Sequence, residues 1–236
     1  MQFTSVGCHN SPTLGGWVKD LKAQYPDQLV VAAFHMDYNG MKDPMGIDAT
    51  TTYMKSFGFS GLPQFVLNNR KIVGDNNSQL NANPNNMFNE MKKELNLYPN
   101  TCGVAIETSY NASTRQLDIQ AKLKSDIDGA EYRCLVYLVE DGISYTQAGV
   151  EGTSYTHNNV VRKLVSSINY GDKIKDEIVK DKEVVKTYTE KLDEGWNADN
   201  MRVIVSITNT LDGGASFTCN NTTECKVGGS VDYLLK

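Results

Sequence analysis

The stretch Phe3-Thr4-Ser5-Val6-Gly7-Cys8-His9-Asn10-Ser11-Pro12 places a single cysteine between a short apolar run and the start of a helix. Residues 3–6 predict a strand that ends at Gly7-Cys8. Ser11 can serve as an N-cap and Pro12 as the first helical residue, where the missing N–H of proline costs nothing. Apolar residues then recur at helical spacing and predict a helix over residues 12–24: Leu14, Trp17, Val18 and Leu21.

Strands and helices continue to alternate up to about residue 97. Residues 29–34 form a nearly continuous apolar run, typical of a central strand covered on both faces and parallel to the first. A helix over residues 47–57 stops at Gly58, a hairpin turns at Asn68-Asn69 between residues 65–67 and 71–73, and a helix covers residues 83–97. The predicted order is β-α-β-α-β-β-α, an α/β domain over residues 1–98.

From residue 99 onward the helical period disappears and apolar residues alternate with polar ones. Six runs read as strands, separated by turns rich in Asn, Asp and Gly: residues 104–106, 117–123, 135–139, 160–164, 174–185 and 203–207. We therefore expect residues 99–236 to form an all-β antiparallel sandwich, immunoglobulin-like or jelly-roll-like.

Length and charge limit the class of protein. A chain of 236 residues fits two compact domains, each with its own core. Its 28 acidic and 23 basic residues give a net charge of −5, and the bases are interleaved with acids, which argues against a nucleic-acid partner. No run of 18 apolar residues predicts a membrane span, and no basic and apolar leader follows Met1. We expect any export signal to lie upstream of the chain.

Five cysteines leave at least one unpaired if disulfides form. Cys219 and Cys225 flank a polar stretch, Asn220-Asn221-Thr222-Thr223-Glu224, which predicts a turn and a disulfide across it, with two free thiols as the alternative. Cys102 and Cys134 fall near the starts of two predicted strands and could also pair. Such bridges would indicate an oxidising compartment.

The first domain resembles the thioredoxin fold over residues 1–97. Cys8-His9-Asn10-Ser11-Pro12 occupies the place of the Cys-x-x-Cys motif of that family, with Ser11 at the position of the second cysteine. Gly61-Leu62-Pro63-Gln64-Phe65 matches the segment whose proline is cis in the family. The resemblance implies that Pro63 lies against the active cysteine, which is Cys8.

The chemistry of such a site depends on its cysteine. Unsatisfied N–H groups at a helix start favour a thiolate, so Cys8 is predicted to be the most reactive thiol, unless it is a small apolar residue at a strand end. Ser11 cannot resolve a mixed disulfide, and Gly7 stands where many relatives carry tryptophan. Two hypotheses follow: a binding or assembly protein with a degenerate site, or a monothiol thiol-disulfide exchanger with Cys8 as nucleophile. Whether the chain is an enzyme stays open.

A narrower resemblance is carried by Tyr155-Thr156-His157-Asn158-Asn159-Val160-Val161-Arg162, with Val139-Glu140-Asp141, Trp196-Asn197 and Phe3-Thr4. These segments resemble the outer-membrane-protein-28-related exported family of Bacteroides-type bacteria. The resemblance implies a lipoprotein of the periplasm or outer membrane, with exported proteins or thiol substrates as partners and membrane attachment only through a lipid anchor. We expect no cofactor and no metal, because His9, His35 and His157 lack ligand spacing. His157 and Arg162 indicate a structural turn and a polar strand face, or a ligand-facing surface.

Overall fold

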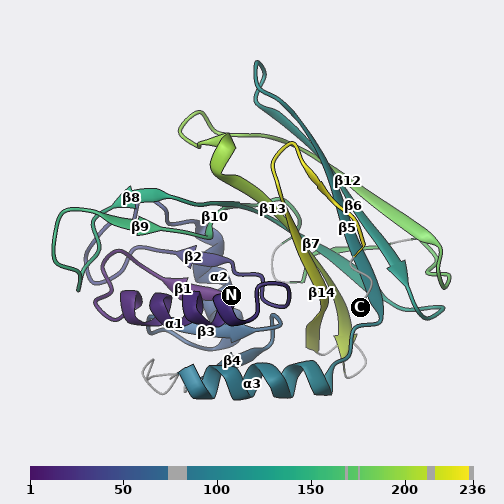
Figure 1. The fold of residues 1–236 in the computed structure, drawn as a ribbon, viewed down its shortest axis with the longest axis horizontal. Coiled ribbons are helices and arrows are strands. Elements are labelled where there is room, and N and C mark those ends of the chain that lie inside the picture. Colours follow the sequence, from purple (N-terminus) through teal and green to yellow (C-terminus); the bar gives the residue numbers. More distant parts are fainter. Residues whose placement is uncertain (74–83, 168–169, 175, 212–215, 234–236) are drawn as a thin grey trace. The chain divides into compact units, whose positions relative to one another are not determined.

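The computed structural model describes residues 1–73, 84–167, 170–174, 176–211 and 216–233 (Figure 1). The chain divides into two compact units. The first unit joins Met1–Tyr98 to Asp141–Arg162, and the second joins Pro99–Glu140 to Lys163–Lys236. The sequence predicts residues 99–236 as one continuous domain, whereas Asp141–Arg162 returns to the first unit.

The first unit has the predicted β-α-β-α-β-β-α order, followed by strands from its returning segment. Its elements are β1 (Gln2–Thr4), α1 (Ser11–Gln24), β2 (Ala33–His35), α2 (Asp48–Phe57), β3 (Gln64–Leu67), β4 (Lys71–Val73), α3 (Pro84–Leu97), β8 (Ile143–Tyr145), β9 (Tyr155–His157) and the start of β10 (Val160–Leu164). Within the described residues, no helix has both the length and the apolar character needed to cross a bilayer.

These strands form a mixed sheet. β1 lies parallel to β2 and antiparallel to β3, β4 pairs with the other edge of β3, and β10 adds to β2 in parallel. One face of this sheet is covered by α1 and α3, whose buried residues pack with Phe65 and Leu67 of β3: Leu14, Val18, Leu21, Met87 and Met91. The other face carries an aromatic cluster with α2: Phe3, Phe34, Tyr53, Phe57 and Phe59. The sheet is therefore buried on both faces, as the continuous apolar run predicts.

Local chemistry explains the end of α2 and the turn between β3 and β4. Gly58 closes α2 in the left-handed conformation with φ 76°, and Asn68 and Asn69 turn the β3–β4 hairpin with φ 49° and 56°. Two details differ from the sequence prediction. Ser11 is the first residue of α1 and Asn10 occupies the N-cap position, and β2 covers only the end of the predicted strand.

The second unit is antiparallel throughout its described strands. These are β5 (Cys102–Asn111), β6 (Gln116–Ser125), β7 (Tyr132–Glu140), β11 (Asp172–Lys173), β12 (Glu183–Lys191), β13 (Met201–Leu211), β14 (Ser216–Lys226) and β15 (Ser230–Val231), with a short 3₁₀ helix η2 (Ala198–Asn200). One sheet has the order β12-β6-β5-β15, and β13 pairs with both β7 and β14 in the other.

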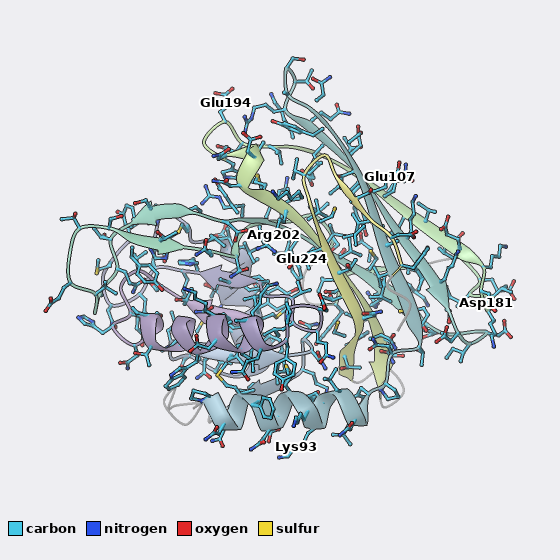
Figure 2. The ribbon with its side chains drawn as sticks, in the orientation of Figure 1. Lys93, Glu107, Asp181, Glu194, Arg202 and Glu224 are labelled. Carbon is cyan, nitrogen blue, oxygen red and sulfur yellow. The ribbon has the colours of Figure 1, made fainter. Side chains whose placement is uncertain are left out.

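A single hydrophobic core joins these two antiparallel layers. Inward residues of β5 and β6 meet those of β7 and β13, among them Ile106, Leu117, Ile119, Val136, Leu138, Val203 and Val205. Burial alternates along β6 and β12 as the sequence pattern predicts, whereas β7 is buried over almost its whole length. Glu107, at an exposed position of β5, is labelled in Figure 2. The predicted strand over residues 174–185 is wrong in its bounds, because the strand begins at Glu183.

The predicted disulfides are wrong, and β14 gives the reason. Cys219 and Cys225 both lie within β14, six residues apart, and an extended strand separates such positions by about 20 Å. A disulfide requires Cα atoms within about 7 Å. Cys102 instead donates its thiol proton to the Oδ1 atom of Asn220 at 3.1 Å, and Cys134 is buried on β7. All five cysteines lie in the described part of the chain, and each is a free thiol.

We expect the protein to carry five free thiols after purification without reductant. Burial raises the pKa of Cys134 to about 12 and that of Cys225 to about 11, so these thiols resist oxidation in the folded state. The measurement is mass spectrometry after alkylation in guanidinium chloride, where five carbamidomethyl groups should be added. An adduct count of three, rising to five after reduction, would show that one disulfide exists.

Candidate functional site

Cys8 lies in the loop between β1 and α1, here called the Cys8 loop (residues 5–10). Its backbone N–H donates to the carbonyl oxygen of Ser5 at 3.1 Å, and its own carbonyl accepts from the N–H of Ser11 at 3.2 Å. The N–H of Gly7 donates to the hydroxyl of Ser5 at 3.1 Å. The residue precedes α1 as the sequence predicts, but Cys8 is only 3% exposed. The loop is compact and holds its cysteine away from solvent.

Ser11 lies at the start of α1, and Pro63 lies directly before β3. The hydroxyl oxygen of Ser11 is buried and has no hydrogen-bond partner among the described residues. The Leu62–Pro63 peptide bond is cis, and Pro63 directly precedes β3. Because β1 and β3 are antiparallel neighbours, the last residue of β1 and the first residue of β3 lie at the same end of these strands. The Cys8 loop, which follows β1, and Pro63, which precedes β3, therefore both extend from that end.

One side of the Cys8 loop is covered by a tight turn, here called the 38–41 turn. Tyr38 and Met41 exchange backbone hydrogen bonds of 3.1 and 3.0 Å, with Asn39 and Gly40 at positive φ. A Cβ atom added to Gly7 would lie 2.3 Å from the carbonyl oxygen of Tyr38. Only glycine fits at position 7, because the 38–41 turn fills the space that a side chain would need.

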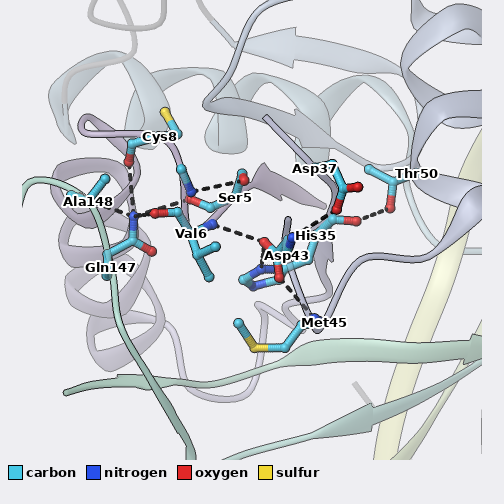
Figure 3. Close-up of polar contacts among 11 residues, drawn as sticks. Ser5, Val6, Cys8, His35, Asp37, Asp43, Met45, Thr50, Gln147 and Ala148 are labelled. Carbon is cyan, nitrogen blue, oxygen red and sulfur yellow. Dashed lines mark hydrogen bonds and ion pairs between the residues drawn. The ribbon is translucent and has the colours of Figure 1, made fainter. Parts of the chain in front are cut away.

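The returning segment holds the Cys8 loop from another direction (Figure 3). The Nε2 atom of Gln147 donates toward the carbonyl oxygens of Ser5, Val6 and Cys8 at 3.1, 3.3 and 3.0 Å. Next to it, the N–H of Ala148 donates to the carbonyl of Val6 at 2.8 Å. In Figure 3 the Cys8 thiol points away from Gln147, which contacts the backbone of the loop and not its sulfur. Gln147 is itself buried, so these contacts are shielded from water.

A buried acid fixes the same loop through a backbone N–H. Asp43 accepts hydrogen bonds from the N–H of Val6 at 2.9 Å, the N–H of Met45 at 2.9 Å and Nδ1 of His35 at 2.8 Å. Burial alone raises the pKa of Asp43, but the hydrogen bonds from His35, Val6 and Met45 and the electrostatic interaction with His35 together hold this pKa below its ordinary value. The carboxylate therefore stays ionised in the interior and anchors three donors.

His157 of β9 packs against this pair. Its ring centroid lies 5.4 Å from that of His35, at an interplanar angle of 74°, and 4.8 Å from that of Tyr155. The Nε2 atom of His157 is buried and has no hydrogen-bond partner among the described residues. Burial and the neighbouring His35 lower the pKa of His157 to about 4. His157 is therefore a neutral imidazole at physiological pH.

The sequence identifies Cys8, Ser11 and Pro63, but not the residues that hold the loop. Asp43 and Gln147 belong to no recognisable motif, and they reach the Cys8 loop from segments 37 and 141 residues away from Val6. From the sequence, His35 is weighed only as a metal ligand, and His157 also as part of a structural turn or a ligand-facing surface. Within the described ranges, no group of three or more His, Cys, Asp or Glu residues is placed to hold a metal ion.

Comparison with known proteins gives a family match and several similar solved structures. The family model for outer membrane protein Omp28 matches residues 50–228. The structure of HBP35 of Porphyromonas gingivalis superposes with a TM-score of 0.75 at 17% identity, covering 96% of this chain and 73% of that one. A domain of the outer membrane lipoprotein Omp28 from Porphyromonas gingivalis matches with a TM-score of 0.37 at 15% identity, covering 55% of this chain and 90% of that one. No curated protein matches the sequence. The similarity to HBP35 is a similarity of fold.

Proposed function

Because the chain belongs to the Omp28 family of outer membrane proteins, we propose that it serves binding or assembly through a thioredoxin-like unit whose cysteine site is degenerate. Family membership makes it an outer-membrane-associated protein of the cell envelope. The natural partners in this proposal are other exported proteins, and a lipid anchor is its attachment to the membrane.

Several features of the first unit support the thioredoxin-like assignment. Its strands have the order β10-β2-β1-β3-β4, with β1 parallel to β2, β3 antiparallel to β1, and β4 antiparallel to β3. A cysteine precedes the first helix, and a cis proline precedes β3. This combination of topology and residue placement is the basis for reading the unit as a thioredoxin scaffold.

The burial of Cys8 carries the proposal that the scaffold binds and does not exchange disulfides. A thiolate must approach a substrate disulfide directly, and Cys8 is 3% exposed in a loop held by both the 38–41 turn and Gln147. Ser11 cannot perform the second step of a dithiol reaction. The other four cysteines all lie in the second unit.

The alternative function is a monothiol exchanger with Cys8 as nucleophile and Pro63 beside it. It is favoured by the position of Cys8 just before α1, in the loop that leaves β1 at the same strand end at which Pro63 enters β3. The N–H groups at the start of α1 would support a thiolate in that case. The two functions differ in whether the thiol reacts.

We expect Cys8 to react with iodoacetamide at least about tenfold more slowly in the folded protein than in guanidinium chloride, because its loop is covered. The rate is measured at Cys8 by peptide mapping. The matched control is His9→Cys, which places a thiol at the exposed neighbouring position and should react rapidly. Reduction of a glutathionylated peptide with added glutathione should proceed at the uncatalysed rate.

The outcomes separate the two functions. Rapid labelling of Cys8, with turnover that disappears in Cys8→Ser, would establish the exchanger. In cells, we expect deletion of the gene to lower the detergent resistance of the envelope and a chromosomal Cys8→Ser substitution to preserve it. A Cys8→Ser strain that behaves like the deletion would contradict the binding or assembly role.

A further inference from the structure

The contacts around the Cys8 loop form a closed polar circuit within the first unit. Asp43 holds the N–H of Val6 and pairs with His35, and the His35 ring packs against His157. His157 pairs with Ile143 in the β8–β9 hairpin, and Gln147 and Ala148 lie in the loop of that hairpin. Gln147 completes the circuit by donating to the carbonyls of the Cys8 loop. His157 thus lies next to both groups that hold the Cys8 loop: Asp43, through His35, and Gln147, through the β8–β9 hairpin.

We propose that this circuit is an acid-sensitive latch, in which a proton on His157 releases the returning segment, and Gln147 with it, from the Cys8 loop. The proposal concerns the control of the loop and does not depend on whether Cys8 is redox-active. In the closed state His157 is neutral, and the latch consists of the contacts made by Gln147 and Ala148.

The geometry of His157 makes a second ring proton unfavourable. Its Nε2 atom is buried and has no hydrogen-bond partner among the described residues. A proton added to Nε2 would create a buried N–H donor with no acceptor and a charge without solvent. Opening the hairpin to water removes both costs.

The titratable groups around the His157 ring do not compensate for that charge. Among the described residues, His35 on β2 faces the ring edge to face, and its electrostatic interaction lowers the pKa of His157. Asp43 in the loop after β2 favours the charge, but its carboxylate already accepts three hydrogen bonds. Tyr155, on the same strand as His157, contributes only its ring. Burial is the largest cause of the lowered pKa, which lies at about 4.

The direction of the pH effect follows from proton binding. With the latch open, His157 takes its ordinary pKa of about 6.5 and binds a proton more readily than in the closed state. The latch is therefore at full strength above pH 6.5 and weakens as the pH falls toward 4. Between pH 7.5 and pH 5 these pKa values raise the opening equilibrium about thirtyfold.

Hydrogen exchange at the Ala148 amide tests the proposal, because this N–H donates directly to the Cys8 loop. After correction for the intrinsic exchange rates, protection of Ala148 should fall about thirtyfold from pH 7.5 to pH 5. Protection of Val18, inside α1 of the same unit, should stay constant over that range. His157→Gln should abolish the fall at Ala148, whereas His9→Gln, at an exposed histidine, should retain it.

Each result decides for or against the latch. Constant protection of Ala148 in the wild-type protein, or an equal fall in His157→Gln, would overturn the proposal. If His157→Gln does not fold, Gln147→Ala provides the test. That variant should show low Ala148 protection at pH 7.5 with no further thirtyfold fall at pH 5, and wild-type protection at both pH values would overturn the role of Gln147.

Discussion

Replacement of Asp43 by leucine is expected to lower the free energy of unfolding by about 4 kcal/mol. The side chain of Asp43 is fully buried and accepts hydrogen bonds from two backbone N–H groups and from His35. Leucine accepts none of them, so the N–H groups of Val6 and Met45 and the imidazole of His35 would remain buried without a partner. Unpaired buried donors are more costly than the hydrogen bonds themselves are worth.

Denaturation by urea, followed by circular dichroism, measures this effect. Asp43→Asn, which keeps one carbonyl oxygen, should cost less than Asp43→Leu. Asp20→Leu, at an exposed position of α1, should change the free energy of unfolding by less than about 0.5 kcal/mol. A loss below about 1 kcal/mol in Asp43→Leu would mean that the circuit around the Cys8 loop contributes little to stability.

Substitution of Gly7 by alanine should lower the free energy of unfolding by about 3 kcal/mol. The new Cβ atom would lie 2.3 Å from the carbonyl oxygen of Tyr38 and 3.1 Å from the Cβ atom of Met41. A backbone carbonyl cannot move aside as a flexible side chain can. Either the 38–41 turn or the Cys8 loop must shift, and the hydrogen bonds of the turn are lost with that shift.

A second glycine of the same unit supplies the control. Gly16 lies in α1 with no atom within 4 Å of its added Cβ, so Gly16→Ala should raise the free energy of unfolding by about 0.5–1 kcal/mol. The pair of variants thus differs in the sign of the change. If Gly7→Ala and Gly16→Ala had similar effects, the close approach of the 38–41 turn to Gly7 would be refuted.

The first unit could be predicted from sequence because its signals are local. Asn68-Asn69 between two apolar runs specifies a hairpin, and Gly58 after an amphipathic run specifies a helix end; both adopt the positive φ that those roles require. The helices are found within one residue of their predicted bounds. Each of these decisions depends on residues within a few positions of one another.

β14 shows where local signals mislead. Its Asn-Asn-Thr-Thr stretch reads as a turn, yet it continues a strand that pairs along β13. Asn220 and Asn221 are accommodated because their side chains bond to the neighbouring segment: Oδ1 of Asn220 accepts from the N–H of Thr101, and Nδ2 of Asn221 donates to the carbonyl of Cys102. Tertiary partners therefore override turn propensity here, and the predicted Cys219–Cys225 disulfide fails with the turn.

The residues of the candidate site also divide into those that local patterns predict and those that depend on tertiary structure. A motif at a helix start and a proline before a strand identify Cys8, Ser11 and Pro63 from sequence. Gln147 could not be found, because a glutamine in a loop carries no signal until the fold brings three carbonyl groups to its amide. Local patterns thus locate the cysteine, whereas the residues that hold it in place depend on the tertiary structure.

The return of Asp141–Arg162 to the first unit has a consequence for synthesis and export. The ribosome adds about 5–20 residues per second, so Arg162 is made roughly 3–13 seconds after Tyr98. During that interval the nascent first unit lacks β10, which pairs with β2, and Gln147, which donates to the carbonyl groups of the Cys8 loop. The first unit can be completed only after Pro99–Glu140 of the second unit has been synthesised, so the two units cannot fold strictly one after the other along the polypeptide.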